Sequence, residues 1–452
     1  MTNRIFLLLS RFVEKGVMFL FFAIMARHFG QAEFGEFSYY FALAAIIFVL
    51  FDNGGELYQM PLIAKYGDSR KLLFRIATTK TFFFMVILSL TLIYIPNVKL
   101  LYLLLAFYLE SLVSLGRSFL FYRGEFIRES IYHTSEKLVL LFLALVAGLW
   151  MDHLIFMYLS LTVGKIVYLT LFITRNNIIG NQNNEPTFIS IVIGSWSYVL
   201  HAGLVAVALQ FDVIIMKQMG VPYDQVALYS AAIRLIMAVT VIPQVLFSYY
   251  YPDVARCLNA GDHDSLVVVL KRARLIEWTA AIVIMYTIVL TSNEIIFMIY
   301  GSGFSDSSVM LSLLAPVILI RFIRYSDSAV LSASEKNKIK LYITISAVLV
   351  GIVLNIALIP RYGIYGPIAS VFVSDAILWI GFRLSAKTIS DAVSSLKVDL
   401  MLSIALFLML FLIIVGMHDM QYARMVLLMF LWSGMAMWFF YRWVYLNRMY
   451  KQ

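Results

Sequence analysis

Apolar runs of about 20 residues recur along the whole chain, and this pattern limits its possible folds most strictly. A run of that length crosses the roughly 30 Å hydrocarbon core of a bilayer as an α-helix. The runs are solid and do not alternate with polar residues, which argues against a membrane β-barrel. Only 13% of the 452 residues are charged and 62% are hydrophobic, whereas about 25% are charged in soluble domains. We therefore expect an all-α integral membrane protein with about fourteen transmembrane helices. The expected spans are residues 5–26, 37–58, 79–96, 100–121, 134–151, 153–174, 189–212, 226–249, 276–299, 309–331, 341–360, 363–384, 399–417 and 423–443.

The Lys and Arg residues indicate how these spans are oriented. Cytoplasmic loops of membrane proteins carry an excess of such residues. With a cytoplasmic N-terminus, and with residues near a span end counted with the adjoining loop, the cytoplasmic segments hold 23 of the 35 Lys and Arg residues, the outer segments hold five, and seven lie deeper within spans. The cytoplasmic count includes Lys80, Lys137, Arg274 and Arg383. This asymmetry predicts an even number of spans with both termini in the cytoplasm. It also explains the net charge of +9 without nucleic-acid binding.

A short Gly-Asp pattern occurs twice in the chain, at a separation of nearly two hundred residues. Gly67-Asp68 opens a basic amphipathic stretch, and Gly261-Asp262 opens a similar stretch 194 residues later. Parallel repeats of this kind place a substrate path between two halves of a transporter. We therefore expect two six-helix lobes in parallel repeat and two additional C-terminal helices. The expected divisions are an N-terminal lobe at 1–175, a cytoplasmic linker at 176–188, a C-terminal lobe at 189–386 and the two extra helices at 387–452.

Charged residues interrupt two of the predicted spans. Arg11, Glu14 and Lys15 lie in the first span, and Arg321, Arg324 and Asp327 lie in the span 309–331. Spacings of three and four residues place each set on one helix face. Charges within a bilayer cost several kcal/mol, so such residues usually face a protein or water-filled interior. The first set is also explained by side chains that reach the cytoplasmic surface, and the second by a charge network that only holds the helices together.

A series of motifs resembles a known family over nearly the whole chain. The motifs are Ala26–Ser38 (Ala-Arg-His-Phe-Gly-Gln-Ala-Glu-Phe-Gly-Glu-Phe-Ser), Asp52–Gly55, Phe211–Ile215, Val226–Ala232, Ile299–Phe304 and Leu354–Gly366. In these motifs and their order the chain resembles the polysaccharide or O-antigen flippases (Wzx-type) of the multidrug/oligosaccharidyl-lipid/polysaccharide exporter superfamily. It departs from them after Asp52, where Asn-Gly-Gly stands in place of the family's longer apolar continuation.

The resemblance implies a function as well as a fold. A member of this family would flip an undecaprenyl-diphosphate-linked oligosaccharide, of the O-antigen (lipopolysaccharide), capsule or exopolysaccharide type, to the periplasmic leaflet of the bacterial inner membrane. The two lobes would open a central cavity alternately to either side. The implied partners are this glycan, membrane lipids, and the polymerase and chain-length machinery of the same pathway. The chain would not be an enzyme and would need no cofactor, although coupling to H⁺ or Na⁺ is open.

A diphosphate head group favours Lys and especially Arg, whose guanidinium presents paired donors to phosphate oxygens. The spans offer seven candidate cations and several acids that are candidates for coupling or gating. The candidate cations are Arg11, Lys15, Arg117, Lys165, Arg234, Arg321 and Arg324, and the candidate acids are Glu14, Asp52, Asp212, Asp327 and Asp375. A structural role is open for each of them, including a pairing of Lys165 with Asp375.

Other classes of membrane protein fit less well. A cation-coupled multidrug exporter of the same superfamily would favour isolated acids over several arginines. A membrane polysaccharide polymerase usually needs a sizeable outer loop, and the predicted outer loops are short. Gly67–Lys71 matches the loop of major-facilitator transporters only in part. The single cysteine, Cys257, excludes an internal disulfide framework, the six histidines show no metal spacing, and no nucleotide-binding glycine-rich loop is present.

Overall fold

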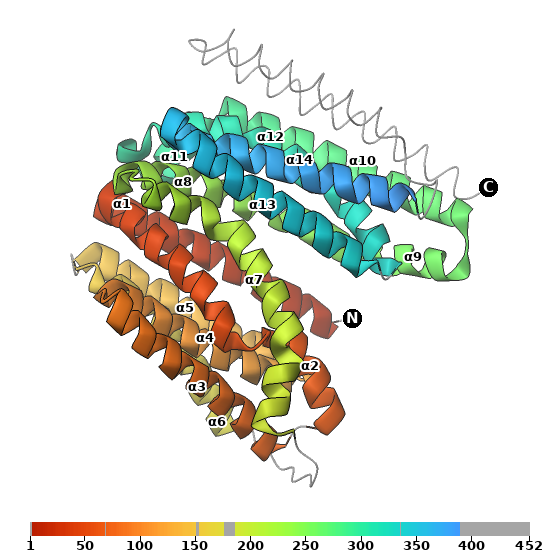
Figure 1. Cartoon of the computed structure of the whole chain (residues 1–452), viewed down its shortest axis with the longest axis horizontal. Helices are drawn as coiled ribbons and strands as arrows, with labels where there is room; N and C mark the ends of the chain where they lie inside the picture. Colours follow the sequence, from red (N-terminus) through yellow and green to blue (C-terminus); the bar gives the residue numbers. More distant parts are fainter. Residues whose placement is uncertain (1, 68, 151–152, 176–185, 335, 389–452) are drawn as a thin grey trace. The chain divides into compact units, whose positions relative to one another are not determined.

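The computed structural model of the chain consists of helices joined by short turns (Figure 1). It describes residues 2–67, 69–150, 153–175, 186–334 and 336–388. No strand occurs in these described ranges, so the all-α prediction is confirmed. The predicted spans 399–417 and 423–443 lie outside the described residues, as does most of the predicted linker 176–188.

The chain forms two compact units, which divide between Ala227 and Leu228. Unit 1 contains seven described helices, and α8 crosses the division into unit 2. The helices of unit 1 are α1 (Thr2–Asp52), α2 (Gly55–Tyr66), α3 (Arg70–Tyr94), α4 (Val98–Tyr122), α5 (Phe126–Trp150), α6 (Ile155–Arg175) and α7 (Phe188–Gln218). The following helices are α8 (Tyr223–Val239), α9 (Val241–Ala260), α10 (His263–Leu290), α11 (Ser292–Tyr300), α12 (Ser307–Ala333), α13 (Asn337–Tyr362) and α14 (Gly366–Lys387).

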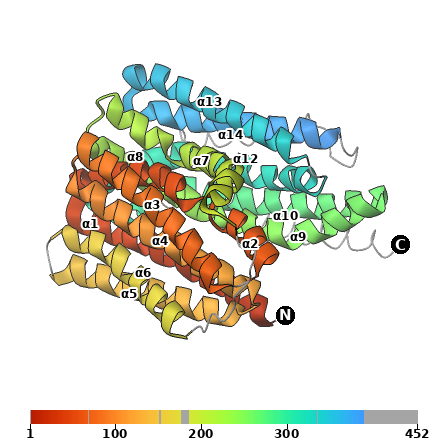
Figure 2. The ribbon, with the colours of Figure 1, turned by 60° about the horizontal axis from the view of Figure 1, so that its bottom comes forward.

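Helix α1 is the framework of unit 1. It changes direction at Gly30, and it packs along α4, α5 and α7 (Figures 1 and 2). Helix α5 packs in turn on α6, and α2 packs on α4. Because α7 packs on α1, it falls in unit 1, whereas the sequence placed it at the start of the C-terminal lobe. The lobe boundaries at 175 and 189 therefore stay a prediction.

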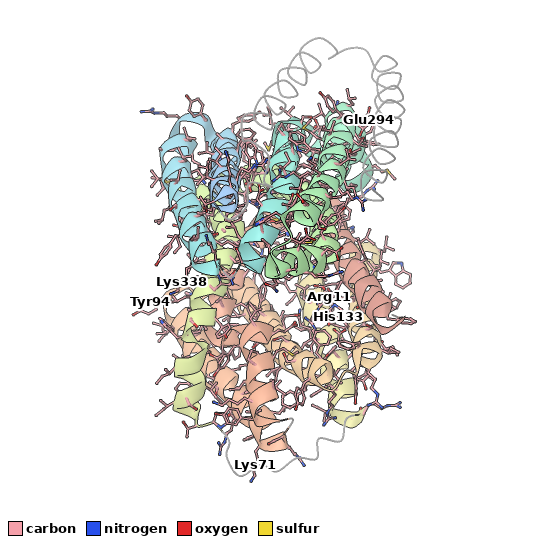
Figure 3. The ribbon with its side chains drawn as sticks, turned by 90° about the vertical axis from the view of Figure 1, so that its right-hand side faces the viewer. Arg11, Lys71, Tyr94, His133, Glu294 and Lys338 are labelled. Carbon is pink, nitrogen blue, oxygen red and sulfur yellow. The ribbon has the colours of Figure 1, made fainter. Side chains whose placement is uncertain are left out.

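Most of the described helices belong to stretches that are long and apolar enough to cross a membrane. Ten helical stretches meet this criterion, and two of them, Ser10–Tyr66 and Asn337–Lys387, have 57 and 51 residues. Since a span needs about 20 residues, each of these two can hold two spans. Lys71 and Tyr94 lie near the two ends of another stretch, α3 (Figure 3). The first twelve predicted spans thus all fall on described helices.

The predicted span 276–299 is divided differently in the structure. Helix α10 begins well before this range, at His263, and ends at Leu290, after which α11 forms a separate short helix. The early start is explained by Leu266 and Leu270, which lie four residues apart and are both buried. The amphipathic stretch that the sequence placed outside the membrane span therefore continues the same helix.

The turn after Asp52 accounts for the departure from the family pattern. Asn53, Gly54 and Gly55 have φ angles of 53°, 76° and 56°. Glycine adopts positive φ readily because it has no Cβ. The turn ends α1 at Asp52 and allows α2 to begin at Gly55, so the apolar run is interrupted by a change in chain direction.

Gly35 allows a close approach within unit 1. An added Cβ at this position would lie 1.9 Å from the carbonyl oxygen of Tyr223. No side chain fits at that distance, so α1 can meet the start of α8 only through glycine. Nearby, Gln218 donates a hydrogen bond to the hydroxyl of Tyr39 at 3.2 Å, and the Lys217 ammonium lies 4.0 Å from the ring centroid of Tyr223.

Helix α12 is the central helix of unit 2. It packs against α9, α10, α11 and α14, and α13 packs mainly on α14. In the most apolar stretch of α12, 72% of the residues are buried inside the protein, compared with 28% in that of α7. Charged side chains on α12 therefore lie among neighbouring helices. This placement makes the partners of those charges the main question in unit 2.

Candidate functional site

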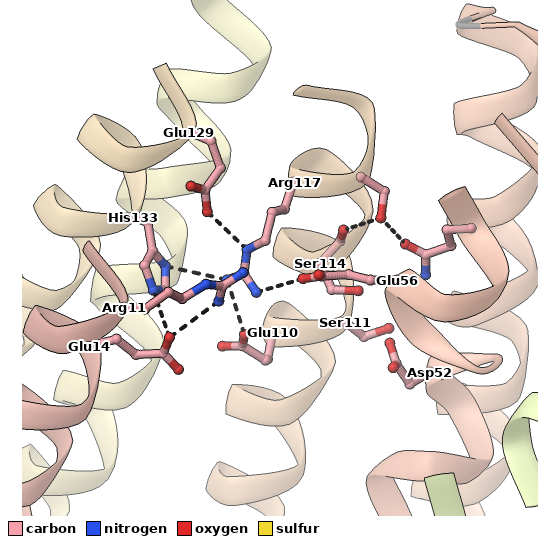
Figure 4. A network of polar contacts seen from close by, with 12 residues as sticks. Arg11, Glu14, Asp52, Glu56, Glu110, Ser111, Ser114, Arg117, Glu129 and His133 are labelled. Carbon is pink, nitrogen blue, oxygen red and sulfur yellow. Dashed lines mark hydrogen bonds and ion pairs between the residues drawn. The ribbon is translucent and has the colours of Figure 1, made fainter. Parts of the chain in front are cut away.

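Arg117 on α4 lies at the centre of a charged network inside unit 1 (Figure 4). Its Nη1 donates to Glu56 Oε1 at 2.7 Å, and its Nε lies 3.2 Å from Glu129 Oε1. Its Nη2 lies 3.7 Å from Glu110 Oε1. The Arg117 side chain is only 7% exposed. Three carboxylates thus surround one guanidinium, and its planar donor groups are directed at protein acids.

His133 on α5 extends this network toward α1. Its Nε2 lies 3.2 Å from Glu14 Oε2, and its Nδ1 lies 3.3 Å from both Glu136 Oε2 and Arg117 Nη2. Arg11 Nη1 donates to the same Glu14 oxygen at 3.3 Å, which explains why Arg11 and His133 appear side by side in Figure 3. The imidazole therefore connects α1, α4 and α5.

Two buried lysines contact the remaining carboxylates of the network. Lys137 Nζ lies 2.6 Å from Glu136 Oε1, and Lys165 Nζ lies 3.4 Å from Glu110 Oε2. Both lysines are buried, and the Glu136 side chain is fully buried. Burying such charges is tolerated only when each has a counter-charge and hydrogen bonds.

The first predicted charge set lies at the exposed edge of this network. The side chains of Arg11 and Lys15 are 33% and 54% exposed, and each contacts Glu14. Such partly exposed pairs contribute little to stability. A role for Arg11 and Lys15 in holding cargo stays a prediction.

Asp52 pairs with a fully buried lysine. Lys80 Nζ donates to Asp52 Oδ1 at 2.7 Å, to Ser111 Oγ at 2.8 Å and to the Ser111 carbonyl at 3.0 Å. The three N–H groups of the ammonium are therefore all used. This cluster ties the end of α1 to α3 and α4.

In unit 2, Arg321, Arg324 and Asp375 form what we call the open triad. Arg321 Nε donates to Asp375 Oδ2 at 2.9 Å, and Arg324 Nη1 donates to Asp375 Oδ1 at 2.7 Å. The two arginine side chains are 14% and 18% exposed, and the aspartate is 6% exposed. One carboxylate on α14 thus holds two guanidinium groups on α12.

Asp327, Arg274 and Arg383 form a second group of the same composition, which we call the sealed triad. Asp327 Oδ1 accepts from Arg274 Nη2 at 2.9 Å and from Arg383 Nη1 at 2.8 Å. The side chains of Asp327 and Arg383 are 0% and 2% exposed. Next to it, the hydroxyl of Ser326 donates to the buried Glu277. The sealed triad therefore joins α10, α12 and α14 away from solvent.

The structure brings some of the predicted residues together and separates others. Arg321 and Arg324 share Asp375, but Asp327, which follows them on α12, has other partners. Lys165 contacts Glu110 and not Asp375. Of the remaining predicted residues, Asp212 is buried on α7, and Arg234 lies on α8 within electrostatic range of Tyr300.

Several buried charges escaped the sequence analysis. We counted Lys80, Lys137, Arg274 and Arg383 with the cytoplasmic loops, which was wrong because each lies on a helix and is buried. A charged residue that has a buried partner need not mark the end of a helix. The spacing of Glu129, His133 and Glu136, which places three ionisable groups on one helix face, is a sequence signal for part of this network.

Comparison with known proteins supports the same fold. The family model described as polysaccharide biosynthesis protein matches residues 1–256, and the model described as MatE matches residues 199–357. No curated protein matches the chain.

Several solved structures share the architecture. The lipid II flippase MurJ in an inward closed conformation is 15% identical, with a TM-score of 0.74, over 97% of this chain and all of that one. An inward-facing multidrug resistance MATE family transporter is 12% identical, with a TM-score of 0.63, over 83% of this chain and 95% of that one. A MOP superfamily transporter from Pyrococcus furiosus, described as having a binding pocket of reverse polarity, is 13% identical, with a TM-score of 0.56. The match covers 86% of this chain and 96% of that one. At these identities the likeness shows the fold.

Proposed function

Since this chain belongs to the polysaccharide biosynthesis protein family, whose model matches more than half of it, we propose that it flips lipid-linked oligosaccharides. The cargo would be an undecaprenyl-diphosphate-linked repeat unit of the O-antigen, capsule or exopolysaccharide type. It would move from the cytoplasmic to the periplasmic leaflet of a bacterial inner membrane. The shared fold with a lipid II flippase supports a lipid-linked cargo.

The transport cycle in this proposal uses alternating access between two lobes, at 1–175 and 189–386. The linker 176–188 would allow their relative motion, and both chain termini would lie in the cytoplasm. The glycan is the substrate, and a polymerase and chain-length machinery would take it over on the far side. Glu14, Asp52, Asp212, Asp327 and Asp375 are the candidates for gating or for coupling to H⁺ or Na⁺.

The open triad carries this proposal. A diphosphate needs several directed N–H donors, and arginine presents five of them in one plane. The contacts to Asp375 use one nitrogen each of Arg321 and Arg324. Further donors of both guanidiniums, which are the partly exposed members of the triad, can therefore meet an anion.

The other candidate cations would have a secondary part. Arg117, Lys165, Arg11 and Lys15 contact protein acids, so they would bind cargo only after their network rearranges. Arg234 is buried within electrostatic range of Tyr300, outside the open triad. We therefore rank it after the open triad.

A cation-coupled multidrug exporter is the second candidate. It is favoured by the MatE match over residues 199–357 and by the acids around Arg117. Such a protein would bind cations, whereas the open triad has two positive charges for one negative charge. The two functions are separated by the charge of the transported compound.

Flipping of labelled glycolipid in inverted membrane vesicles tests the proposal. Periodate protection reports which leaflet holds the labelled unit, and Arg321→Ala/Arg324→Ala should abolish its movement while the protein stays inserted. Arg256→Ala is a matched control, because that arginine side chain is 76% exposed. Normal movement without the protein would refute the flippase function, and export of a cationic dye in its place would support the second candidate.

A further inference from the structure

The two triads of unit 2 have the same chemistry but different surroundings. Each has one aspartate between two arginines, and each joins α12 to α14. In the sealed triad, Arg274 and Arg383 are 9% and 2% exposed around a fully buried aspartate. In the open triad, both arginines are more exposed than their aspartate. A ligand could therefore reach the cations of the open triad before it met the carboxylate.

The surroundings of the open triad add to its positive charge. Lys340 on α13 lies within electrostatic range of Arg324. Its ammonium donates to the hydroxyls of Ser328 and Ser332 at 2.9 and 2.8 Å, and neither group is charged. Lys340 thus adds a third positive charge beside the two arginines that share Asp375. A divalent anion would balance this charge better than a carboxylate alone.

The carboxylate occupies the position that a phosphate group would take. Each oxygen of Asp375 accepts from a different arginine, and a phosphate binds two guanidiniums in the same manner. We propose that Asp375 is a built-in competitor for the anionic ligand of Arg321 and Arg324. It holds both guanidiniums in place between cargoes, and the diphosphate of the cargo displaces it.

This competitor would make release possible. A transport site must bind its ligand well enough to accept it and weakly enough to let it go. Asp375 returns to the arginines as the diphosphate leaves, so neither guanidinium is left buried without a counter-charge. The inference rests on the proposed function for the identity of the cargo, but only on the open triad for binding of a diphosphate.

Binding of inorganic pyrophosphate to the purified full-length protein in lipid nanodiscs tests the competition. Isothermal titration calorimetry would compare the wild type with Asp375→Asn, Asp375→Glu and Arg321→Ala/Arg324→Ala. We expect Asp375→Asn to bind about tenfold more tightly or better, since two charge-assisted hydrogen bonds no longer compete. Asp375→Glu should stay near the wild type, and the double alanine variant should lose binding. Equal or weaker binding by Asp375→Asn would overturn the proposal.

Transport provides a readout that a purely structural role would not produce. In the vesicle assay, Asp375→Asn should move glycolipid more slowly although it binds diphosphate more tightly, because release becomes limiting. A loss of both binding and transport in a folded variant would mean that Asp375 only positions the arginines. Undecaprenyl diphosphate, titrated beside inorganic pyrophosphate, shows whether the site takes the lipid-linked or the free form.

A measurement on the wild type covers the case in which Asp375→Asn does not fold. Hydrophobic carbodiimides modify protonated carboxyl groups, and a buried carboxylate that loses its cations is protonated more readily. Pyrophosphate should therefore raise labelling at Asp375, detected by mass spectrometry, and leave Asp327 unchanged. Unchanged labelling at saturating pyrophosphate would refute displacement. Pyrophosphate binding without glycolipid flipping would refute the proposed cargo and leave the competitor role intact.

Discussion

The charged interiors of the two units are built with different stoichiometries. The network around Arg117, together with the Asp52–Lys80 pair, contains six cations and six acids. In unit 2, the two triads and the buried Glu277 beside the sealed triad contain four arginines and three acids. The cost of burying unpaired charge is enough to explain a network in which cations and acids are equal in number. The open triad has two partly exposed arginines for one aspartate, and this combination makes it the candidate anion site.

The largest effect is expected at the sealed triad, because its aspartate is fully buried. Asp327→Asn leaves Arg274 and Arg383 without their shared carboxylate, and breaking a buried pair costs about 3–5 kcal/mol. Thermal unfolding in detergent should show a larger loss for Asp327→Asn than for Asp375→Asn, whose arginines reach solvent. Equal losses would remove the distinction between the sealed and open triads.

A somewhat smaller loss is expected at the centre of the balanced network. Arg117→Ala leaves Glu56, Glu110 and Glu129 without their common cation, and we expect a loss of about 3 kcal/mol in the free energy of unfolding. Arg117→Lys should recover only part of it, since an ammonium lacks the planar donors that meet three carboxylates. Chemical denaturation of both variants provides the measurement. Full stability of Arg117→Ala would show that the network is not what holds α4 in place.

A double-mutant cycle at Asp52 and Lys80 tests whether stability depends on the balance of the two buried charges. Lys80→Met alone leaves a buried carboxylate, whereas Lys80→Met/Asp52→Asn removes both charges. The double variant should therefore be more stable than the single one by roughly 2 kcal/mol. Additive losses would indicate that the two side chains act independently in spite of their 2.7 Å contact.

The smallest effect is expected at the exposed edge of the network. Arg11→Ala and Lys15→Ala should each change stability by less than about 0.5 kcal/mol, because both side chains are partly exposed. Thermal unfolding and the flipping assay together separate two roles. A stable variant that transports poorly would place these cations on the cargo path, and a stable variant with normal transport would not.

The membrane fold followed from local properties of the sequence. Apolar runs of sufficient length form helices in a bilayer because no water is present to satisfy the backbone, and neighbouring residues alone decide this. The family motifs and the order of the helices were readable for the same reason. The ends of the spans were less accurate, as α10 shows, because burial of Leu266 and Leu270 depends on other helices.

The partners of the charges were decided by the tertiary structure. Helical spacing showed that Arg321, Arg324 and Asp327 share a face, but it could not show that Asp375 serves the first two while Arg274 and Arg383 serve the third. Electrostatic pairing depends on distances between helices that are far apart in the chain, and no local pattern contains them. The sequence by itself thus determined that charges lie inside a helical membrane protein. Only the packing of α10, α12 and α14 decided which of these charges are fully buried with their partners and which are partly exposed.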